Sequence, residues 1–279
     1  MKDVFINICI PYYNASEYFE ETLISITNQS YKNWKIYIFD DGSDKTEIEK
    51  LYPLFRGIEN KVEVIHSKHI GVYKSRLELI NKVKNGYLIF VDADDMFASD
   101  EALSQICKQI EYSNADIIFY NYSIDRKDNL GQIKDFSKLK SVRSAIKEAL
   151  RNECLNSLWN KAINVKVKKN IVFPELENIF IAEDRLISIF TLLKCKSVSY
   201  INKVLYLYRD NILSASNVML DLDRLFCQLK VEKQIQTILK TAINYSYCPD
   251  VYLLESVFYT YLWFVFKNCK NKNTRIKIY

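Results

Sequence analysis

Three carboxylates, Asp92, Asp94 and Asp95, directly follow a short apolar stretch at residues 87–91. That stretch is rich in β-branched and aromatic residues, which predicts a buried strand of a largely parallel sheet. The acids then lie at the C-terminal end of the strand, where open α/β sheets bind ligands. Because carboxylates this close repel one another, the run predicts a Mn²⁺ or Mg²⁺ site shared with substrate phosphates. The alternative is a solvated acidic turn in which Asp95 or Ser99 caps the next helix.

A second acidic cluster at residues 40–44 follows another expected strand, residues 34–39. Strands at 5–10, 34–39, 62–66 and 87–91 alternate with helices at 16–28 and 44–52 and with one that opens at Gly71. This alternation predicts a doubly wound α/β sheet with right-handed crossovers. Both clusters then meet at one edge, so Asp40, Asp41, Asp92 and Asp94 are expected to line one cleft. Turn chemistry alone is the competing interpretation of residues 40–44.

Composition and missing motifs exclude several classes of protein. The chain has 279 residues, enough for one large domain with an appended piece, and a formal charge of +5 without a dense basic block. Nucleic acid is therefore not an expected partner. Neither a G-x-G-x-x-G nor a G-x-x-x-x-G-K-[ST] pattern follows the first strand, which disfavours dinucleotide oxidoreductases and P-loop enzymes. The seven cysteines are dispersed, and His66 and His69 have no further histidine with which to complete a zinc site.

Several motifs together resemble family 2 glycosyltransferases of the GT-A fold. They are Ile-Cys-Ile-Pro-Tyr-Tyr-Asn at residues 8–14, Asn-Gln-Ser-Tyr at 28–31 and Phe-Asp-Asp-Gly-Ser at 39–43. Gly71 with Arg76, and Val-Asp-Ala-Asp-Asp at 91–95, are similar to later elements of the family. Leu77 stands where the family usually carries Asn, and Asp44 follows Ser43 directly. The resemblance is strong over the first hundred residues and weaker to about residue 216.

The resemblance implies a nucleotide-sugar pocket built from these motifs. Pro11 and Tyr13, with Asn14 beside them, would wall the base, and Asp41 or Asp40 would hydrogen-bond its edge. Arg76 would lie near the base or the diphosphate. Asp92 would face the ribose and sugar and share the metal with Asp94. A solvated helix residue is the alternative interpretation of Arg76, and a core aromatic that of Tyr13.

Residues after the first hundred would complete the catalytic site. The Glu183–Asp184 pair resembles the family's "E-D" signature, in which the Asp is the general base; Glu183 is the alternate. Such a base is required because the acceptor hydroxyl must lose its proton as it attacks the anomeric carbon, and one displacement inverts that centre. The structural alternative is an acidic pair that favours a helix start. Trp159 and Lys161 would line the acceptor side, unless Trp159 is a core residue.

The remaining elements complete a predicted GT-A sheet with flanking helices and a C-terminal helical extension. Residues 1–216 would form the catalytic domain, with a nucleotide-binding half at 1–98 and an acceptor half at 99–216, and residues 217–279 the extension. Helices are expected at 99–114 and 142–151, a strand at 116–122, a hairpin or loop over the cleft at 126–138, and a hairpin from strands at 196–201 and 204–208. Tyr-Leu-Tyr-Arg at residues 206–209 resembles a further element of the family, which implies that Arg209 would reach the diphosphate. The alternative is a surface arginine at a strand end. An apolar helix at 251–266 with a basic tail would contact an anionic membrane surface, or pack on the catalytic domain or a second subunit.

The family resemblance implies a metal-dependent, inverting transferase working in the cytoplasm, at the inner face of the membrane. It would move a hexose or N-acetylhexosamine from a UDP-sugar to a glycan or glycolipid hydroxyl in bacterial surface polysaccharide or lipooligosaccharide synthesis. A nucleotidyltransferase shares such a sheet, but the first strand lacks the glycine-rich loop that it would need. An inactive glycan-binding scaffold would lack the acids, and all of them are present.

Overall fold

The computed structural model describes residues 4–126, 129–130, 139, 141–151, 155–209 and 222–241. Most of the loop predicted at 126–138 lies outside these described residues. The apolar helix predicted at 251–266, its basic tail, and the membrane or subunit contact assigned to them lie outside as well.

The described residues form one nine-stranded sheet in the order β3-β2-β1-β4-β8-β6-β9-β5, with β7 paired to β6. Strands β1 (Ile6–Tyr12), β2 (Trp34–Asp40), β3 (Val62–His66) and β4 (Tyr87–Phe90) are parallel to one another. Strand order reverses between β1 and β4, which creates the switch point at which doubly wound sheets bind ligands. The predicted α/β fold is confirmed, and both acidic clusters end strands at this edge.

The second half of the sheet departs from the prediction. Strand β9 (Val198–Arg209) is one continuous strand parallel to β6 (Ile117–Arg126), so the predicted hairpin is wrong. The polar residues Asn202 and Lys203 suggested a turn, but they lie exposed within β9, and the irregularity is a register shift at Asn121. Strand β8 (Lys161–Asn164), which was not predicted, joins β4 and β6 in antiparallel pairing. The short strands β5 (Met96–Phe97) and β7 (Asn129–Leu130) pair antiparallel with β9 and β6.

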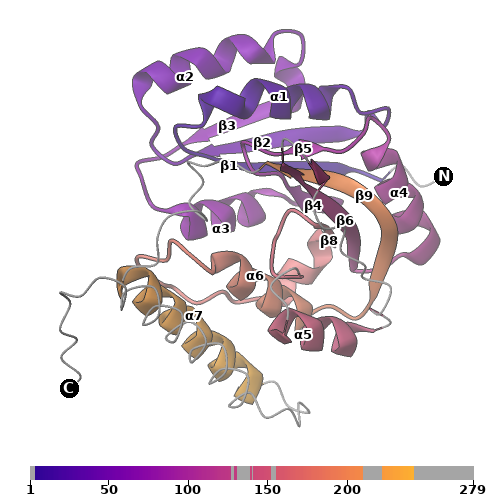
Figure 1. Cartoon of the computed structure of the whole chain (residues 1–279), viewed down its shortest axis with the longest axis vertical. Helices are drawn as coiled ribbons and strands as arrows, with labels where there is room; N and C mark the ends of the chain where they lie inside the picture. The colour runs from indigo at the N-terminus through magenta and orange to yellow at the C-terminus, as the bar shows by residue number, and fades with distance from the viewer. Residues whose placement is uncertain are drawn as a thin grey trace.

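Helices cover both faces of the sheet (Figure 1). Helices α1 (Ser16–Thr27) and α2 (Lys45–Leu51) lie on one face, and α3 (Val72–Lys82) and α6 (Glu183–Leu192) on the other. Helix α4 (Ala102–Ser113) packs beside β6 and β9, whereas α5 (Val142–Arg151) and α7 (Leu222–Thr241) pack on α6. Short 3₁₀ turns η1 (Tyr52–Phe55), η2 (Glu59–Lys61) and η4 (Val165–Asn170) join these elements.

The core runs through the parallel strands, and β1 and β4 are buried on both faces. Ile8 and Ile10 of β1, Ile38 of β2 and Ile89 of β4 have no exposed surface. This two-sided burial explains why the strands read as continuous apolar runs. Strand β1 continues through Pro11, where a break was expected, because its pairing with β4 ends two residues earlier and the missing N–H interrupts no ladder there.

Candidate active site

A cavity of about 370 Å³ opens at the C-terminal ends of β1 and β4. Its wall comes from the end of β1, the first turn of α1, the second acidic cluster, α3, the loop after β4, and β9. The structure brings together most of the residues predicted for the donor: Pro11, Tyr13, Asn14, Asp41, Arg76, Asp92 and Asp94 all line this cavity. Asp40 and Arg209 do not.

Asp41 and Tyr13 shape the end of the cavity between β1 and α3. The Asp41 carboxylate is 4% exposed and accepts hydrogen bonds from the Ile70 N–H at 2.6 Å and the Gly71 N–H at 3.0 Å. Gly71 has a φ of +89°, a conformation that L side chains avoid, so glycine is needed at this turn. The Tyr13 ring is 50% exposed and lies 4.6 Å from the His69 ring, so Tyr13 is a rim residue and not a core aromatic.

Asp40 stabilises the turn behind the cavity. Its carboxylate accepts from the Ser43 N–H at 3.0 Å and lies 2.8 Å from His66 Nδ1. Of these two neighbouring acids, Asp41 lines the cavity and Asp40 does not. The expectation that Asp40 lines the cleft is therefore corrected, and Asp41 is the candidate for contact with a base.

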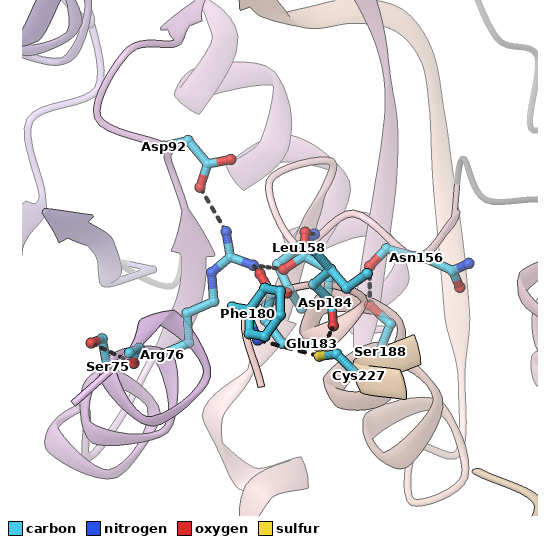
Figure 2. Close-up of polar contacts among 12 residues, drawn as sticks. Ser75, Arg76, Asp92, Asn156, Leu158, Phe180, Glu183, Asp184, Ser188 and Cys227 are labelled. Atoms are coloured by element: carbon cyan, nitrogen blue, oxygen red, sulfur yellow. Dashed lines mark hydrogen bonds and ion pairs between the residues drawn. The ribbon is translucent and has the colours of Figure 1, made fainter. Parts of the chain in front are cut away.

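Arg76 connects the two groups of acids predicted to carry the chemistry (Figure 2). Its guanidinium donates to Asp92 Oδ1 at 3.0 Å and to Glu183 Oε1 at 2.8 Å, and it forms an ion pair with Asp184. Arg76 is 5% exposed, which excludes a solvated helix residue. Burial lowers its pKa, but Asp92 and Glu183 outweigh that effect and raise the pKa of Arg76. The guanidinium therefore remains a buried cation among three carboxylates.

Asp92 and Asp94 stand together on the cavity wall. Burial raises the pKa of Asp92 and Arg76 opposes that shift, while Asp94 and Glu183 add to it. Within the residues that the structure describes, no cluster of three or more His, Cys, Asp or Glu could hold a metal alone. Two carboxylates that face a cavity suit Mg²⁺ or Mn²⁺, which take one or two carboxylates and complete their shell with phosphates and water. The donor set thus fits a hard cation shared with a diphosphate.

Asp95, the third acid after β4, is buried and does not face the cavity as Asp92 and Asp94 do. It is 1% exposed, and its carboxylate accepts from the Tyr206 hydroxyl at 2.7 Å and the Arg209 N–H at 2.8 Å. Burial raises the pKa of Asp95 well above its usual value. Asp95 therefore joins the loop after β4 to β9, and the capping role considered for it is not what the structure shows.

The Arg209 side chain stabilises the same loop. Its Nε donates to the Asp94 carbonyl at 2.8 Å, its Nη2 pairs with Glu21 at 2.5 Å, and its guanidinium lies 4.7 Å from the centre of the Tyr18 ring. These contacts hold the Asp94 backbone. The structure thus places Arg209 behind Asp94, while its predicted contact with the diphosphate stays a prediction.

Glu183 and Asp184 form the first turn of α6. Asp184 Oδ2 accepts from the Leu158 N–H at 3.4 Å, and both acids contact Arg76 (Figure 2). The preceding residue, Ala182, has a left-handed backbone with φ of +60°. The two alternative bases therefore share one cation.

The residues predicted for the acceptor side are both buried. Lys161 is 1% exposed, and its Nζ donates to the Leu155 carbonyl at 2.7 Å and to Ser188 Oγ at 2.8 Å. Burial lowers the pKa of Lys161 well below its usual value. The assignment of Lys161 to the acceptor is corrected, because its head group ties β8 and the preceding segment to α6.

Trp159 belongs to an aromatic stack that ends at the cavity. It is 6% exposed and stacks on Tyr206 at 4.8 Å and on Tyr208 at 5.6 Å between ring centres. The Trp159 indole is therefore a core side chain, which was the alternative interpretation of this residue. Tyr208 is partly exposed and lines the cavity, so the aromatic face open to a ligand is the one that sequence reasoning missed. Both β8 and β9 pair with β6, and this arrangement brings Trp159 next to the tyrosines of β9.

Comparison with known proteins establishes the family. Residues 7–169 match the family model "Glycosyl transferase family 2", which is more than half of the chain. The chain belongs to this family of glycosyltransferases.

The relatives and structural neighbours agree with that assignment. The chain is 27% identical over 215 residues to glycosyltransferase GlyA of Streptococcus pneumoniae, a match that covers 73% of this chain and 30% of GlyA. It is 23% identical over 214 residues to the uncharacterized glycosyltransferase EpsJ of Bacillus subtilis, covering 74% of this chain and 61% of EpsJ. The chain thus spans less than two thirds of both relatives. The fold matches S. aureus TarS 1–349 in complex with UDP-GlcNAc, with a TM-score of 0.71, 18% identity, and coverage of 98% of this chain and 76% of TarS 1–349.

None of the helices that the structure describes is both long and apolar enough to cross a membrane.

Proposed function

We propose that this chain transfers a hexose or N-acetylhexosamine from a UDP-sugar to a hydroxyl of a glycan or glycolipid, with inversion at the anomeric carbon. One observation carries the proposal: Arg76 joins Asp92, on the wall of the cavity, to Glu183 and Asp184 at the start of α6. Groups suited to binding a diphosphate and groups suited to accepting a proton are thereby held next to each other.

The donor would occupy the cavity with its base between Tyr13 and Asp41. A volume of about 370 Å³ lies within the usual size range of small-molecule sites. The Tyr13 ring offers a stacking face, and the Asp41 carboxylate is fixed by two backbone N–H groups. TarS 1–349, whose fold this chain shares, has been solved in complex with UDP and with UDP-GlcNAc, which favours a uridine donor.

Asp94 and Asp92 would hold a Mn²⁺ or Mg²⁺ ion. That ion, when bound, would neutralise charge developing on the departing nucleoside diphosphate. A mannosyltransferase from Pyrobaculum calidifontis with a related fold, at a TM-score of 0.57, binds GDP-Man and Mn²⁺. The Arg209 contact to the Asp94 carbonyl would fix this ligand in place.

Asp184 would accept the proton of the acceptor hydroxyl, with Glu183 as the alternate. The acceptor oxygen forms a bond to the anomeric carbon while the bond from that carbon to the diphosphate oxygen breaks. The proton passes to the carboxylate, and the electron pair leaves with the nucleoside diphosphate. One displacement of this kind inverts the centre, and the base must come within hydrogen-bond reach of the hydroxyl.

The acceptor would approach over the Tyr208 face. Aromatic rings pack against the apolar faces of sugars, and Trp159 holds Tyr208 from behind. The relatives include "Putative teichuronic acid biosynthesis glycosyltransferase TuaG" of Bacillus subtilis, at 27% identity over 124 residues, which cover 44% of this chain and 48% of TuaG. We extend the proposal to surface polysaccharide synthesis, with the apolar and basic sequence of residues 251–277 contacting an anionic membrane or a second subunit.

Release of nucleotide from UDP-, GDP-, CMP- and dTDP-sugars, with Mn²⁺ and with chelator, tests the proposal. We expect release from one UDP-sugar, dependent on the metal and lost in Asp94→Ala and in Asp184→Ala. Glu111→Ala, which removes an exposed acid from α4, is the matched control and should keep full activity. Calorimetry of UDP with Mn²⁺ reports donor binding when no acceptor is known. Pyrophosphate as the product would instead indicate a nucleotidyltransferase, and glycan binding without UDP binding would indicate a scaffold.

A further inference from the structure

The turn that precedes the catalytic acids has a strained backbone. Ala182 has φ of +60° and ψ of +10°, the left-handed region that non-glycine residues rarely adopt. Such a conformation persists only where surrounding contacts determine it, and it is common at functional sites. Glu183 and Asp184 follow directly, so the contacts that hold this turn also set where the two carboxylates point.

Helix α7 supplies one set of those contacts. Cys227 is 2% exposed; its Sγ accepts from the Phe180 N–H at 3.4 Å, and its thiol donates to the Ile181 carbonyl at 3.5 Å. Figure 2 shows Cys227 beside Phe180, on the side of the first turn of α6 away from Asp92. The Cys227 thiol therefore hydrogen-bonds to the Phe180 N–H and to the Ile181 carbonyl, which directly precede the strained residue Ala182.

A buried ion pair supplies the second set. Arg185 Nε donates to Glu232 Oε1 of α7 at 2.5 Å, and Arg185 Nη1 donates to the Ala149 carbonyl of α5 at 2.9 Å. Glu232 is 3% exposed, so the pair is shielded from solvent. Arg185 is the residue after Asp184, and its anchoring fixes the helix turn from which Asp184 projects.

We propose that α7 positions Glu183 and Asp184 for proton transfer through Cys227 and the Arg185–Glu232 pair. This inference rests on the proposed function of the two acids. Helix α7 lies outside residues 7–169, which match the family model, and within the extension predicted at 217–279. The catalytic turn is thus held by Arg76 on the donor side and by α7 on the other. Part of the extension therefore supports the turn that carries the two acids.

Two sets of variants separate positioning from folding. Arg185→Met with Glu232→Leu replaces the buried pair by apolar residues, an exchange that proteins often tolerate without loss of stability. Cys227→Ala removes the thiol contacts, and Cys227→Ser keeps a donor and an acceptor at that place. Asp223→Asn, an exposed acid on the same helix, is the matched control.

We expect kcat to fall about 10- to 100-fold in the double variant and in Cys227→Ala, because misplacing a catalytic group costs rate in that range. UDP affinity and Tm should stay close to wild type, Cys227→Ser should recover most of the rate, and the control should match wild type. Amide exchange at residues 180–185 should accelerate in the impaired variants alone.

Three results would overturn the inference. One is wild-type kcat in both the double variant and Cys227→Ala. Another is a loss of kcat that always accompanies a loss of UDP binding and Tm, since that shows a folding contact. The third is unchanged amide exchange at residues 180–185. If the wild-type chain transfers no sugar, the proposed function fails separately, and the exchange measurement still decides whether α7 holds this turn.

Discussion

Replacing Arg76 by alanine should be among the most destabilising single changes near the cavity. Its side chain is 7% exposed and contacts Asp92, Glu183 and Asp184. Removing one partner from a buried ion pair costs about 3–5 kcal/mol, because the opposite charge stays buried without compensation. Here three carboxylates lose their shared cation, so we expect Arg76→Ala to lower the unfolding free energy by an amount in that range.

The matched control is Lys74→Ala on the same helix. Lys74 pairs with Glu177 at 2.6 Å, but the two side chains are 36% and 78% exposed. Exposed pairs of this kind contribute about 0–1 kcal/mol, since solvent screens them. Arg76→Lys should fall between the two variants, because one ammonium keeps the charge but cannot span Asp92 and Glu183 as a guanidinium does.

Urea unfolding at pH 7 gives the free energies by linear extrapolation, with the slope checked for each variant. We expect the unfolding free energies of Arg76→Ala and Lys74→Ala to differ by at least about 2 kcal/mol. If Arg76→Ala loses no more stability than Lys74→Ala at an unchanged slope, Arg76 is not the buried cation that holds these acids.

Three further predictions concern neighbouring residues. The unfolded chain protonates Lys161 below about pH 10.4, whereas burial lowers the folded-state pKa. At a pH between the folded-state and unfolded-state pKa values of Lys161, unfolding therefore takes up a proton. In this pH range the free energy of unfolding of the wild type, measured with urea, should rise with pH relative to that of Lys161→Met. Asp95→Asn should lower the unfolding free energy by about 1–3 kcal/mol, because the Arg209 N–H or the Tyr206 hydroxyl loses its acceptor. Tyr208→Leu should raise the acceptor KM while UDP affinity measured by calorimetry stays unchanged, and Tyr208→Phe should restore the KM.

Each of these has an outcome that contradicts it. Parallel pH curves for wild type and Lys161→Met would mean that Lys161 is charged in the folded state. Asp95→Asn at wild-type stability would show that its two hydrogen bonds add nothing. An unchanged acceptor KM in Tyr208→Leu, or weaker UDP binding in it, would remove Tyr208 from the acceptor side.

The first hundred residues could be interpreted with little error because their signals are local. Apolar runs that end in acids define β2 and β4, and the rule that ligands bind at the C-terminal ends of parallel strands places Asp41, Asp92 and Asp94 at one edge. The second half required information that lies far along the chain. Strand β9 pairs with β6, about 80 positions earlier in the chain. The polar residues Asn202 and Lys203 inside β9 have the composition of a turn, and they led to the wrong prediction of a hairpin.

Residue types, their order and the strand–helix alternation were sufficient to identify the α/β fold, the family and the cavity-facing acids. The fold and the edge at which the acids lie follow from local periodicity and a topological rule, and the family follows from the resemblance of short motifs. All of these are properties of residues that lie close together in the sequence. Tertiary structure alone decided which of two adjacent acids faces the cavity, and that Arg76 joins Asp92 to Glu183, which lies 107 positions after Arg76. It also decided that Lys161 is buried while Tyr208 lines the cavity. Burial and ion pairing depend on which groups packing brings together from distant parts of the chain, so they cannot be predicted from the local sequence pattern.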